Sequence, residues 1–178
     1  MRLPLILLTL LTALAALGQP AFRFHLVQNV EGFPLKDINC IVEDDKGFLW
    51  FGGPYGLYRW DGVTASLFAH DPADPASLTY GAVSHLLKSR NGGLWVGTYR
   101  GGLSFMDWET QKSKNYLRDP NIRGSLVGNM VTGLYEDRQN RLWVGTDRFA
   151  LHRLDPGKEE FIAYHPPFPT DSSWTSLS

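Results

Sequence analysis

One five-residue motif occurs three times in this chain, and it limits the possible folds more than any other feature. Its copies are Leu49-Trp50-Phe51-Gly52-Gly53, Leu94-Trp95-Val96-Gly97-Thr98 and Leu142-Trp143-Val144-Gly145-Thr146. The first two tryptophans lie 45 residues apart, and the last two lie 48 apart. A nearly constant period of this length indicates a repeat protein, in which each repeat is one supersecondary unit.

Each copy lies within the same series of short segments. An apolar run closed by a polar turn precedes the motif, and an apolar segment that ends in Asp follows it. These segments predict strands at 38–42, 83–87 and 131–135 before the motif and at 56–61, 102–107 and 150–155 after it. Weaker aromatic segments predict a fourth strand in each repeat, at 67–68, 116–117 and 161–164.

Four short strands per repeat of this length are typical of a β-propeller blade. We therefore predict an all-β chain with three blades of four antiparallel strands, at residues 36–70, 78–118 and 126–165. A blade is buried on both faces by its neighbours, so its inner strands can carry large side chains on either side. The predicted core residues of the repeat are Trp50, Gly52, Trp95, Gly97, Trp143 and Gly145.

The glycine of the motif has a specific predicted role. Trp95 and Gly97 share one face of their strand, because side chains alternate with a period of two. A glycine inside a strand often marks a close approach of another group. We predict that the missing side chain at Gly97 leaves room for a bulky group from the adjoining blade.

The two ends of the chain have other predicted roles. Residues 1–18 combine Arg2, an apolar run of 13 residues and a final Ala-Leu-Gly, which predicts a secretory signal peptide and an exported, periplasmic protein. The remainder, 19–178, is predicted to be a partial propeller, with a closing outer strand at 22–27 and the start of a further repeat at 166–178. Because rings usually need four to eight blades, three blades predict a fragment whose open apolar faces promote association.

Composition and motifs argue against several functional classes. The net charge of −1 gives no basic excess for binding nucleic acid. The five histidines show no paired spacing suited to a metal, and no phosphate-binding loop or nucleophile motif is present. We therefore predict no catalytic site, metal or cofactor in this chain. Cys40 is the only cysteine, so no internal disulfide is predicted.

A turn motif of sialidase-like propellers occurs once in the chain. The segment from Asp45 to Trp50 has the D-x-G-x-x-W spacing of the Asp-box turn, but the other copies place Arg90 and Arg138 at the Asp position. We interpret this segment as a solution to a hairpin turn that all three repeats share.

Several spaced elements of the chain together resemble one known family. These elements are Phe33-Pro34, the segment from Glu43 to Gly52, the segment from Gly56 to Gly62, Gly92 to Thr98 with Gly101-Gly102-Leu103, and Arg141 to Thr146. They are similar to the repeats of the two-component regulator propeller family, and the resemblance covers 22–178. It implies the periplasmic sensor region of a bacterial hybrid two-component histidine kinase, with about seven blades before a β-sandwich, a membrane span and a kinase.

The chain departs from the family pattern at two places. Gly53 replaces the usual Thr, and Phe149-Ala150 replaces the usual Gly-Gly pair. The second departure predicts a distorted turn in the third repeat.

The expected function is ligand sensing, for a carbohydrate or other nutrient, passed to a kinase through a change in shape or dimer geometry. The expected partners are a small-molecule or oligosaccharide ligand, the remaining blades, and the membrane and kinase domains of the parent protein, which itself can dimerise. Two alternatives remain open: a secreted propeller enzyme (lyase or glycoside hydrolase), which needs paired carboxylates, and a non-catalytic interaction scaffold.

Candidate ligand-binding residues follow the second strand of each repeat. They are Tyr55, Tyr99, Arg100, Asp147 and Arg148. Loops held by a rigid scaffold commonly carry function, and aromatic rings beside charged groups suit a sugar ring and its hydroxyl or acidic substituents. The other interpretation is that these are solvated turn residues.

Overall fold

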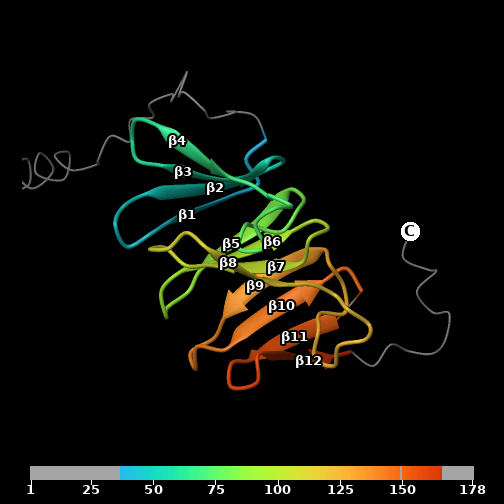
Figure 1. The fold of residues 1–178 in the computed structure, drawn as a ribbon. Coiled ribbons are helices and arrows are strands. Elements are labelled where there is room, and N and C mark those ends of the chain that lie inside the picture. The colour runs from blue at the N-terminus through green and yellow to red at the C-terminus, as the bar shows by residue number, and fades with distance from the viewer. Residues whose placement is uncertain (1–36, 149, 166–178) are drawn as a thin grey trace, which may run out of the picture.

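The structure is a computed structural model that describes residues 37–148 and 150–165. The described chain forms three four-stranded antiparallel sheets (Figure 1), and the strands of each sheet follow chain order. The first sheet contains β1 (Cys40–Glu43), β2 (Leu49–Gly53), β3 (Gly56–Trp60) and β4 (Ala65–Phe68). The second contains β5 (Val83–Lys88), β6 (Leu94–Thr98), β7 (Leu103–Met106) and β8 (Ser113–Tyr116). The third contains β9 (Val131–Glu136), β10 (Leu142–Thr146), β11 (Ala150–Asp155) and β12 (Glu160–Tyr164).

The all-β prediction, with three sheets of four antiparallel strands, is confirmed. The predicted signal peptide at 1–18, the closing strand at 22–27 and the further repeat at 166–178 lie outside the described residues. Within 37–148 and 150–165, no helix has the length and apolar character needed to cross a bilayer.

The fourth strand of the second sheet is the one that the sequence indicated least well. An aromatic segment at 116–117 predicted it, but β8 runs over Ser113–Tyr116 and is mostly polar. Its strand geometry comes from pairing with β7, where Met106 lies opposite Ser113. An outermost strand is only partly covered, so it does not need the apolar sequence of an inner strand.

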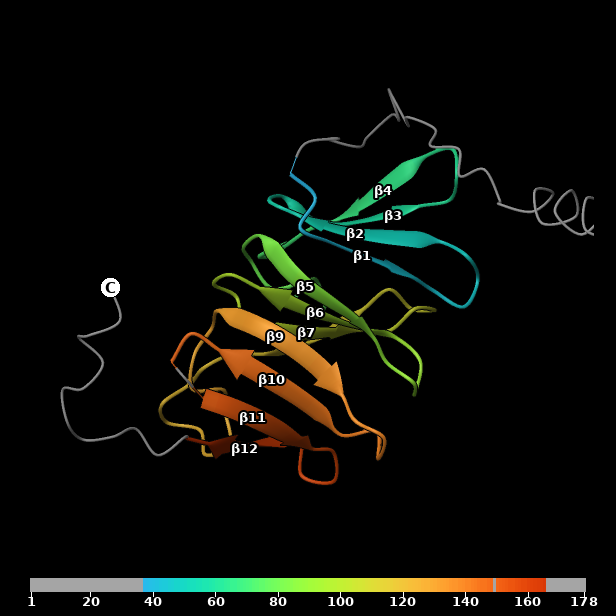
Figure 2. The same ribbon diagram turned by 180° about the vertical axis from the view of Figure 1, so that it is seen from behind.

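The sheets pack against one another in sequence order (Figure 2). β5 contacts β1 and β2 of the preceding sheet, and β9 contacts β5 and β6 in the same way. One apolar cluster fills the junction between the first and second sheets, and a second cluster fills the next junction. The first cluster contains Trp50, Leu57, Leu78, Val83, Leu94, Val96 and Met106. The second contains Trp95, Leu103, Leu126, Val131, Leu142, Val144 and Phe161.

The glycine of the repeated motif lies where two sheets approach most closely. A Cβ atom added at Gly97 would lie 2.6 Å from Val131 Cγ1, in the first strand of the next sheet. At Gly52, a Cβ atom would meet Val83 Cγ1 at 2.5 Å. These distances are far below van der Waals contact, so any side chain at either position would force the sheets apart. Val131 therefore occupies the space that the missing side chain at Gly97 leaves.

The segments that join the sheets are fixed by side chains of the sheet they enter. The backbone N–H of Thr79 donates to Ser104 Oγ at 3.3 Å. The backbone N–H of Val127 donates to His152 Nε2 at 3.0 Å. Each acceptor lies on the third strand of its sheet, so a side chain in that strand positions the incoming connection.

Candidate functional site

Each sheet has two ends with different structures. One end carries the turns between the first and second strands, here called the turn end. The other carries the loops between the second and third strands, here called the loop end. Only the loop end carries the predicted ligand-binding residues, so the two ends are described separately.

At the turn end of the first sheet, a single carboxylate organises the hairpin. Asp44 Oδ1 accepts hydrogen bonds from the backbone N–H groups of Lys46 and Phe48, each at 2.9 Å. Asp44 Oδ2 accepts a hydrogen bond from Trp50 Nε1 at 2.9 Å. The buried indole N–H therefore has its partner, and the turn is fixed to the core tryptophan.

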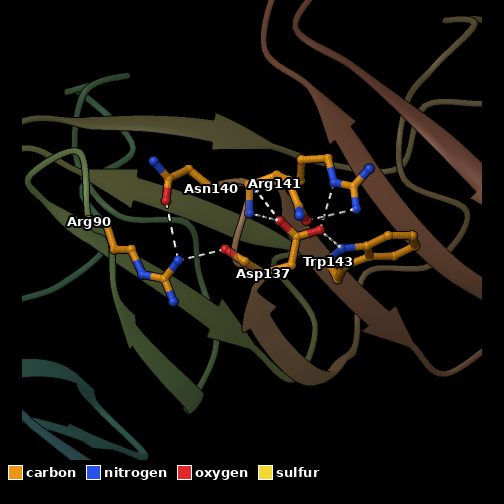
Figure 3. Close-up of polar contacts among 6 residues, drawn as sticks. Arg90, Asp137, Asn140, Arg141 and Trp143 are labelled. Carbon is orange, nitrogen blue, oxygen red and sulfur yellow. Dashed lines mark hydrogen bonds and ion pairs between the residues drawn. The ribbon is translucent and has the colours of Figure 1, made fainter.

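The third sheet repeats this arrangement with an additional arginine (Figure 3). Asp137 Oδ1 accepts from the backbone N–H of Gln139 and of Arg141, and Oδ2 accepts from Trp143 Nε1 at 2.9 Å and from Arg141 Nε at 2.6 Å. Burial acts to raise the pKa of Asp137, but the hydrogen bonds from Trp143, Arg141 and Gln139 outweigh it and hold the pKa well below its ordinary value. Asp137 therefore stays ionised as a structural anion.

The structure identifies the acid that fixes the turn. The D-x-G-x-x-W spacing begins at Asp45, but the residue that fixes the hairpin is Asp44, six positions before the tryptophan. Asp137 holds the same position in the third repeat, and Ser89 holds it in the second, where its Oγ accepts from the backbone N–H of Asn91 at 3.3 Å. The interpretation of a shared hairpin turn holds, with a different residue at its centre.

The residues at 45 and 90 contact the following sheet instead. Asp45 forms an ion pair with Lys88 at 2.5 Å. The backbone N–H of Arg90 donates to Glu136 Oε2 at 3.0 Å, and its guanidinium donates to the carbonyl of Asp137 at 2.7 Å (Figure 3). The polar groups of the turn end therefore bond to each other and to the neighbouring sheet, so we assign this end a structural role.

At the loop end, the predicted ligand-binding residues are exposed. Tyr55 is 69% exposed and Tyr99 is 45% exposed. Arg100, Asp147 and Arg148 are exposed as well. The structure places each of them in the loop between the second and third strands of its sheet, and no ion pair or hydrogen bond between these side chains is present in the described chain.

The backbone of the second and third loops is fixed to the incoming connections. The N–H of Tyr99 donates to the carbonyl of Ala82 at 3.0 Å, and the N–H of Asp147 donates to the carbonyl of Met130 at 3.0 Å. Ala82 and Met130 directly precede the first strands of their sheets. The loop and the incoming connection therefore lie at the same end of the sheet, and each holds the other in place.

A threonine and two glycines shape the loop of the second repeat. Thr98 Oγ1 donates to the carbonyl of Gly102 at 3.1 Å and accepts from the N–H of Gly101 at 2.8 Å. The carbonyl of Tyr80 leaves no room for a Cβ atom at Gly101, and Gly102 has a φ of 75°. Both positions therefore favour glycine.

The corresponding loop of the third repeat is described only in part. Thr146 occupies the position of Thr98, but its buried Oγ1 has no hydrogen-bond partner among the described residues. Residue 149 lies outside the described chain, so the distorted turn itself stays a prediction.

Tyr80 is a loop-end aromatic residue that the sequence analysis missed. It lies in the connection between the first two sheets, is 48% exposed, and packs edge-on against His70 with ring centroids 6.2 Å apart. Its carbonyl lies against Gly101, the residue after Arg100. Tyr80 could have been found only from its position in a connection that returns to the loop end. That position becomes clear only when the strands have been placed.

The other reactive side chains of the described chain have structural surroundings. His152 is fully buried, with Nε2 accepting from Val127 and Nδ1 within 3.2 Å of the carbonyl of Val144. Burial is the main reason that the pKa of His152 lies below its ordinary value. Burial also raises the pKa of the Cys40 thiol to about 11, against a smaller lowering by the backbone of Gly52. Within 37–148 and 150–165, no three His, Cys, Asp or Glu residues are grouped so that they could hold a metal ion.

A hollow of about 520 Å³ lies at the outer strands of the second and third sheets. Its lining includes Tyr116, Ile122, Arg123, Lys158 and Phe161. None of the predicted ligand-binding residues lines it. The hollow therefore gives no support to the loop-end residues as a site.

The sequence and the structure were compared with known proteins. The profile of the family described as "Two component regulator propeller" matches residues 32–55, 77–100 and 125–148. Each match includes one tryptophan motif and ends in the loop that carries the candidate residues. A comparison with curated proteins finds no match.

Two solved structures resemble the described sheets. The extracellular domain of a hybrid two component system from B. thetaiotaomicron is similar with 28% identity and a TM-score of 0.68, over 72% of this chain. The virginiamycin B lyase from Staphylococcus aureus is similar with 15% identity and a TM-score of 0.57, over 78% of this chain, a likeness that concerns the fold alone. This chain spans 18% of the first structure and 44% of the second.

Proposed function

We propose that this chain, which carries three two-component regulator propeller repeats, is part of the ligand-sensing domain of a bacterial two-component signalling protein. Propellers of this type occur in extracellular sensor domains of hybrid two-component systems. The proposed location is the periplasm, which the signal-like sequence at 1–18 supports. The proposed partners are the further blades, membrane span and kinase of a longer protein.

The proposed ligand site is the loop end, and one observation carries this proposal. Exposed aromatic rings and charged groups lie there on three loops, and the backbones of the second and third loops are fixed by hydrogen bonds to the adjacent connections. A rigid scaffold lowers the entropy cost of binding, because the site does not have to be ordered first.

The chemistry of these side chains favours an oligosaccharide ligand, in particular one that carries acidic groups. The rings of Tyr55 and Tyr99 are flat apolar surfaces that can stack on a sugar ring. Arg100 and Arg148 carry planar guanidinium groups that recognise carboxylates through paired hydrogen bonds. A carbohydrate with carboxylate substituents would use both features.

The same loops do not favour a propeller enzyme. Glycoside hydrolysis commonly needs two carboxylates on either side of the scissile bond. Among the described residues of the three loops, Asp147 is the single carboxylate. We therefore assign the loop end a binding role.

Signalling requires that the ligand prefers one of two arrangements of the sensor. A ligand shifts an equilibrium only by the difference between its affinities for the two states. The loops of the second and third sheets are each bonded to the connection that enters their sheet. A ligand that spans these two loops would therefore also act on the junction between the two sheets. We propose that this junction is the element through which binding changes the shape or dimer geometry of the sensor.

The test is calorimetry on the intact protein with tetragalacturonate as the acidic probe and cellotetraose as the neutral probe. We expect the acidic probe to bind, and the double substitution Tyr99→Ala with Arg100→Ala to weaken it at least tenfold, which corresponds to about 1.4 kcal/mol. The control is Lys46→Ala with Asn91→Ala, which removes two exposed side chains from the turn end. Equal affinity in the wild type and a correctly folded loop-end variant would remove this loop from the site, and binding of neither probe would contradict the carbohydrate assignment.

A further inference from the structure

The two connections between sheets are held by different chemistry, although they occupy equivalent places in the repeat. The connection into the second sheet is held by hydroxyl and amide groups. Ser104 Oγ accepts from the backbone N–H of Thr79 at 3.3 Å and donates to Asn115 Oδ1 at 2.7 Å. The amide of Asn115 donates in turn to the carbonyl of Ser77 at 2.9 Å. None of these side chains is ionisable.

A histidine takes over this task in the third sheet. Ser104 lies opposite Asn115 in the pairing of β7 with β8. The equivalent pair in β11 and β12 is His152 with Ala163, so a methyl group stands in place of the asparagine amide. The imidazole of His152 accepts from the incoming connection, through the backbone N–H of Val127 at 3.0 Å. An ionisable ring therefore holds the second connection.

The hydrogen bonds of His152 require a neutral imidazole. Its Nδ1 lies 3.2 Å from the carbonyl of Val144, which can only accept, so Nδ1 carries the proton. Nε2 then has the lone pair that accepts from Val127. A second proton would occupy this lone pair and set two N–H donors against each other. Because the ring is completely buried, an imidazolium there would also lose its hydration.

The surroundings of His152 do not favour a positive charge. Strand β10 and residues 124–130, which supply the two hydrogen-bond partners of the ring, carry no charged side chain. The other titratable groups directed at this junction are Arg90, Lys114, Tyr116, Glu136, Glu159 and His165. Both carboxylates in this set already have a partner. Asp147 lies against Gly128 at the loop end, where it is exposed. No carboxylate of the described chain forms an ion pair with His152.

The connection that His152 holds is also bonded to two of the candidate loops. The carbonyl of Asn129 accepts from the N–H of Gly102 at 2.8 Å, in the loop of the second sheet. The carbonyl of Met130 accepts from the N–H of Asp147 at 3.0 Å, in the loop of the third sheet. The bond to His152 therefore fixes the segment to which both loops are tied.

We propose that His152 makes the loop end pH-dependent, because protonation of its ring releases the connection at Val127 and loosens the loops of the second and third sheets together. At neutral pH, the neutral ring accepts from Val127 and the connection is held. In acid, the imidazolium cannot accept, so residues 127–130 separate from β11 and their bonds to Gly102 and Asp147 weaken. The connection held by Ser104 does not respond. This inference concerns the loops themselves and holds whether or not a ligand binds there.

The direction of the pH dependence follows from the burial of the ring. Burial is the main reason that the pKa of His152 lies below its ordinary value of 6.5. The hydrogen bond to Val144 acts in the opposite direction, and the charge of His165 adds to the lowering. Because the folded pKa lies below the unfolded one, the contribution of His152 to stability is complete above about pH 6.5. It is lost as the pH falls through the folded pKa.

The test is amide exchange of the full chain, resolved by NMR and expressed as protection factors at about pH 7.5 and about pH 5. We expect the factors of Val127, Gly102 and Asp147 to fall at least about fivefold at the lower pH, the size expected for one lost hydrogen bond. Thr79 and Tyr99 are the reference amides, because both are bonded at the first connection. Their factors should change by less than about twofold.

The second repeat supplies the matched variant. His152→Ser with Ala163→Asn installs the side chains found at Ser104 and Asn115, so the fall at the three amides should disappear. His152→Gln keeps an acceptor that does not titrate, and it should give the same result where the double variant fails to fold. The control is His165→Gln, which removes an exposed histidine of the same sheet. The fall should remain in this variant and move to higher pH, because a like charge is gone.

Three results would overturn the proposal. One is unchanged protection of Val127, Gly102 and Asp147 in the wild type. Another is an equal fall at Thr79 and Tyr99, which would show a general effect of acid. The third is a pH dependence that persists in the folded variants of His152, or that disappears in His165→Gln.

Discussion

The contact between Gly97 and Val131 gives the sharpest test of the packing between sheets. Gly97→Ala would place a methyl group 2.6 Å from Val131 Cγ1 and 2.9 Å from Val131 Cβ. Val131 is 1% exposed, so it has little space into which to move. Inserting a carbon into a packed core costs about 1–3 kcal/mol, and we expect Gly97→Ala to lower the free energy of unfolding by that amount.

Gly133→Ala is the matched control, because Gly133 also lies within a strand but a Cβ atom there would meet nothing within 4 Å. This variant should be neutral or stabilising by up to about 1 kcal/mol, since alanine restricts the unfolded chain. The two variants are compared by urea unfolding, followed by tryptophan fluorescence. If Gly97→Ala were as stable as Gly133→Ala within about 0.5 kcal/mol, the close approach at Gly97 would not limit packing.

A double-mutant cycle identifies the colliding group. Val131→Ala removes both methyl groups of that side chain, so it should relieve part of the strain of Gly97→Ala. We expect the double variant to lose less stability than the sum of the single variants, with a coupling of about 0.5–3 kcal/mol. Strict additivity would mean that Gly97→Ala acts through some other neighbour.

Two other predictions concern the core and the turn end. Trp95→Ala should cost about 3–5 kcal/mol of stability, because Trp95 is 7% exposed and its ring centroid lies 4.6 Å from that of Phe105; a loss below about 1 kcal/mol in urea unfolding would show that it is not a core residue. Asp137→Asn should destabilise the protein at neutral pH. The pKa of Asp137 is lowered in the folded state, so the ionised carboxylate stabilises the fold at pH values above its ordinary pKa of 3.8. This stabilisation is lost as the pH falls through the folded pKa. Thermal unfolding should therefore show the difference from the wild type shrinking below about pH 4, and a gap that stays constant with pH would contradict an ionised turn acid.

The sequence was sufficient to predict the sheets because their signals are local and repeated. The motif around each tryptophan combines a strand with a glycine at a fixed place, and three copies at similar spacing leave few alternatives to a propeller repeat. The outer strand β8 was harder to predict, because Ser113–Tyr116 is polar and becomes a strand through pairing with β7.

The residues that act across space were predicted less well. The spacing predicted a shared hairpin turn but did not identify the acid that holds it, and only hydrogen-bond geometry shows that this acid is Asp44. His152 had no recognisable pattern, because its partner Val127 lies in a connection 25 residues away. Tyr80 likewise reaches the loop end through the path of the chain, which no short motif records.

Amide hydrogen exchange in the intact protein tests the proposed loop-end ligand site most directly. The exchange is compared with and without saturating tetragalacturonate, and the turn ends serve as an internal reference. The proposal predicts slower exchange in 53–56, 80–82, 98–102 and 146–148, with unchanged exchange in the turns at 44–48, 89–93 and 137–141. Protection confined to those turns, or no protection in any of the loops when the probe is bound, would contradict it.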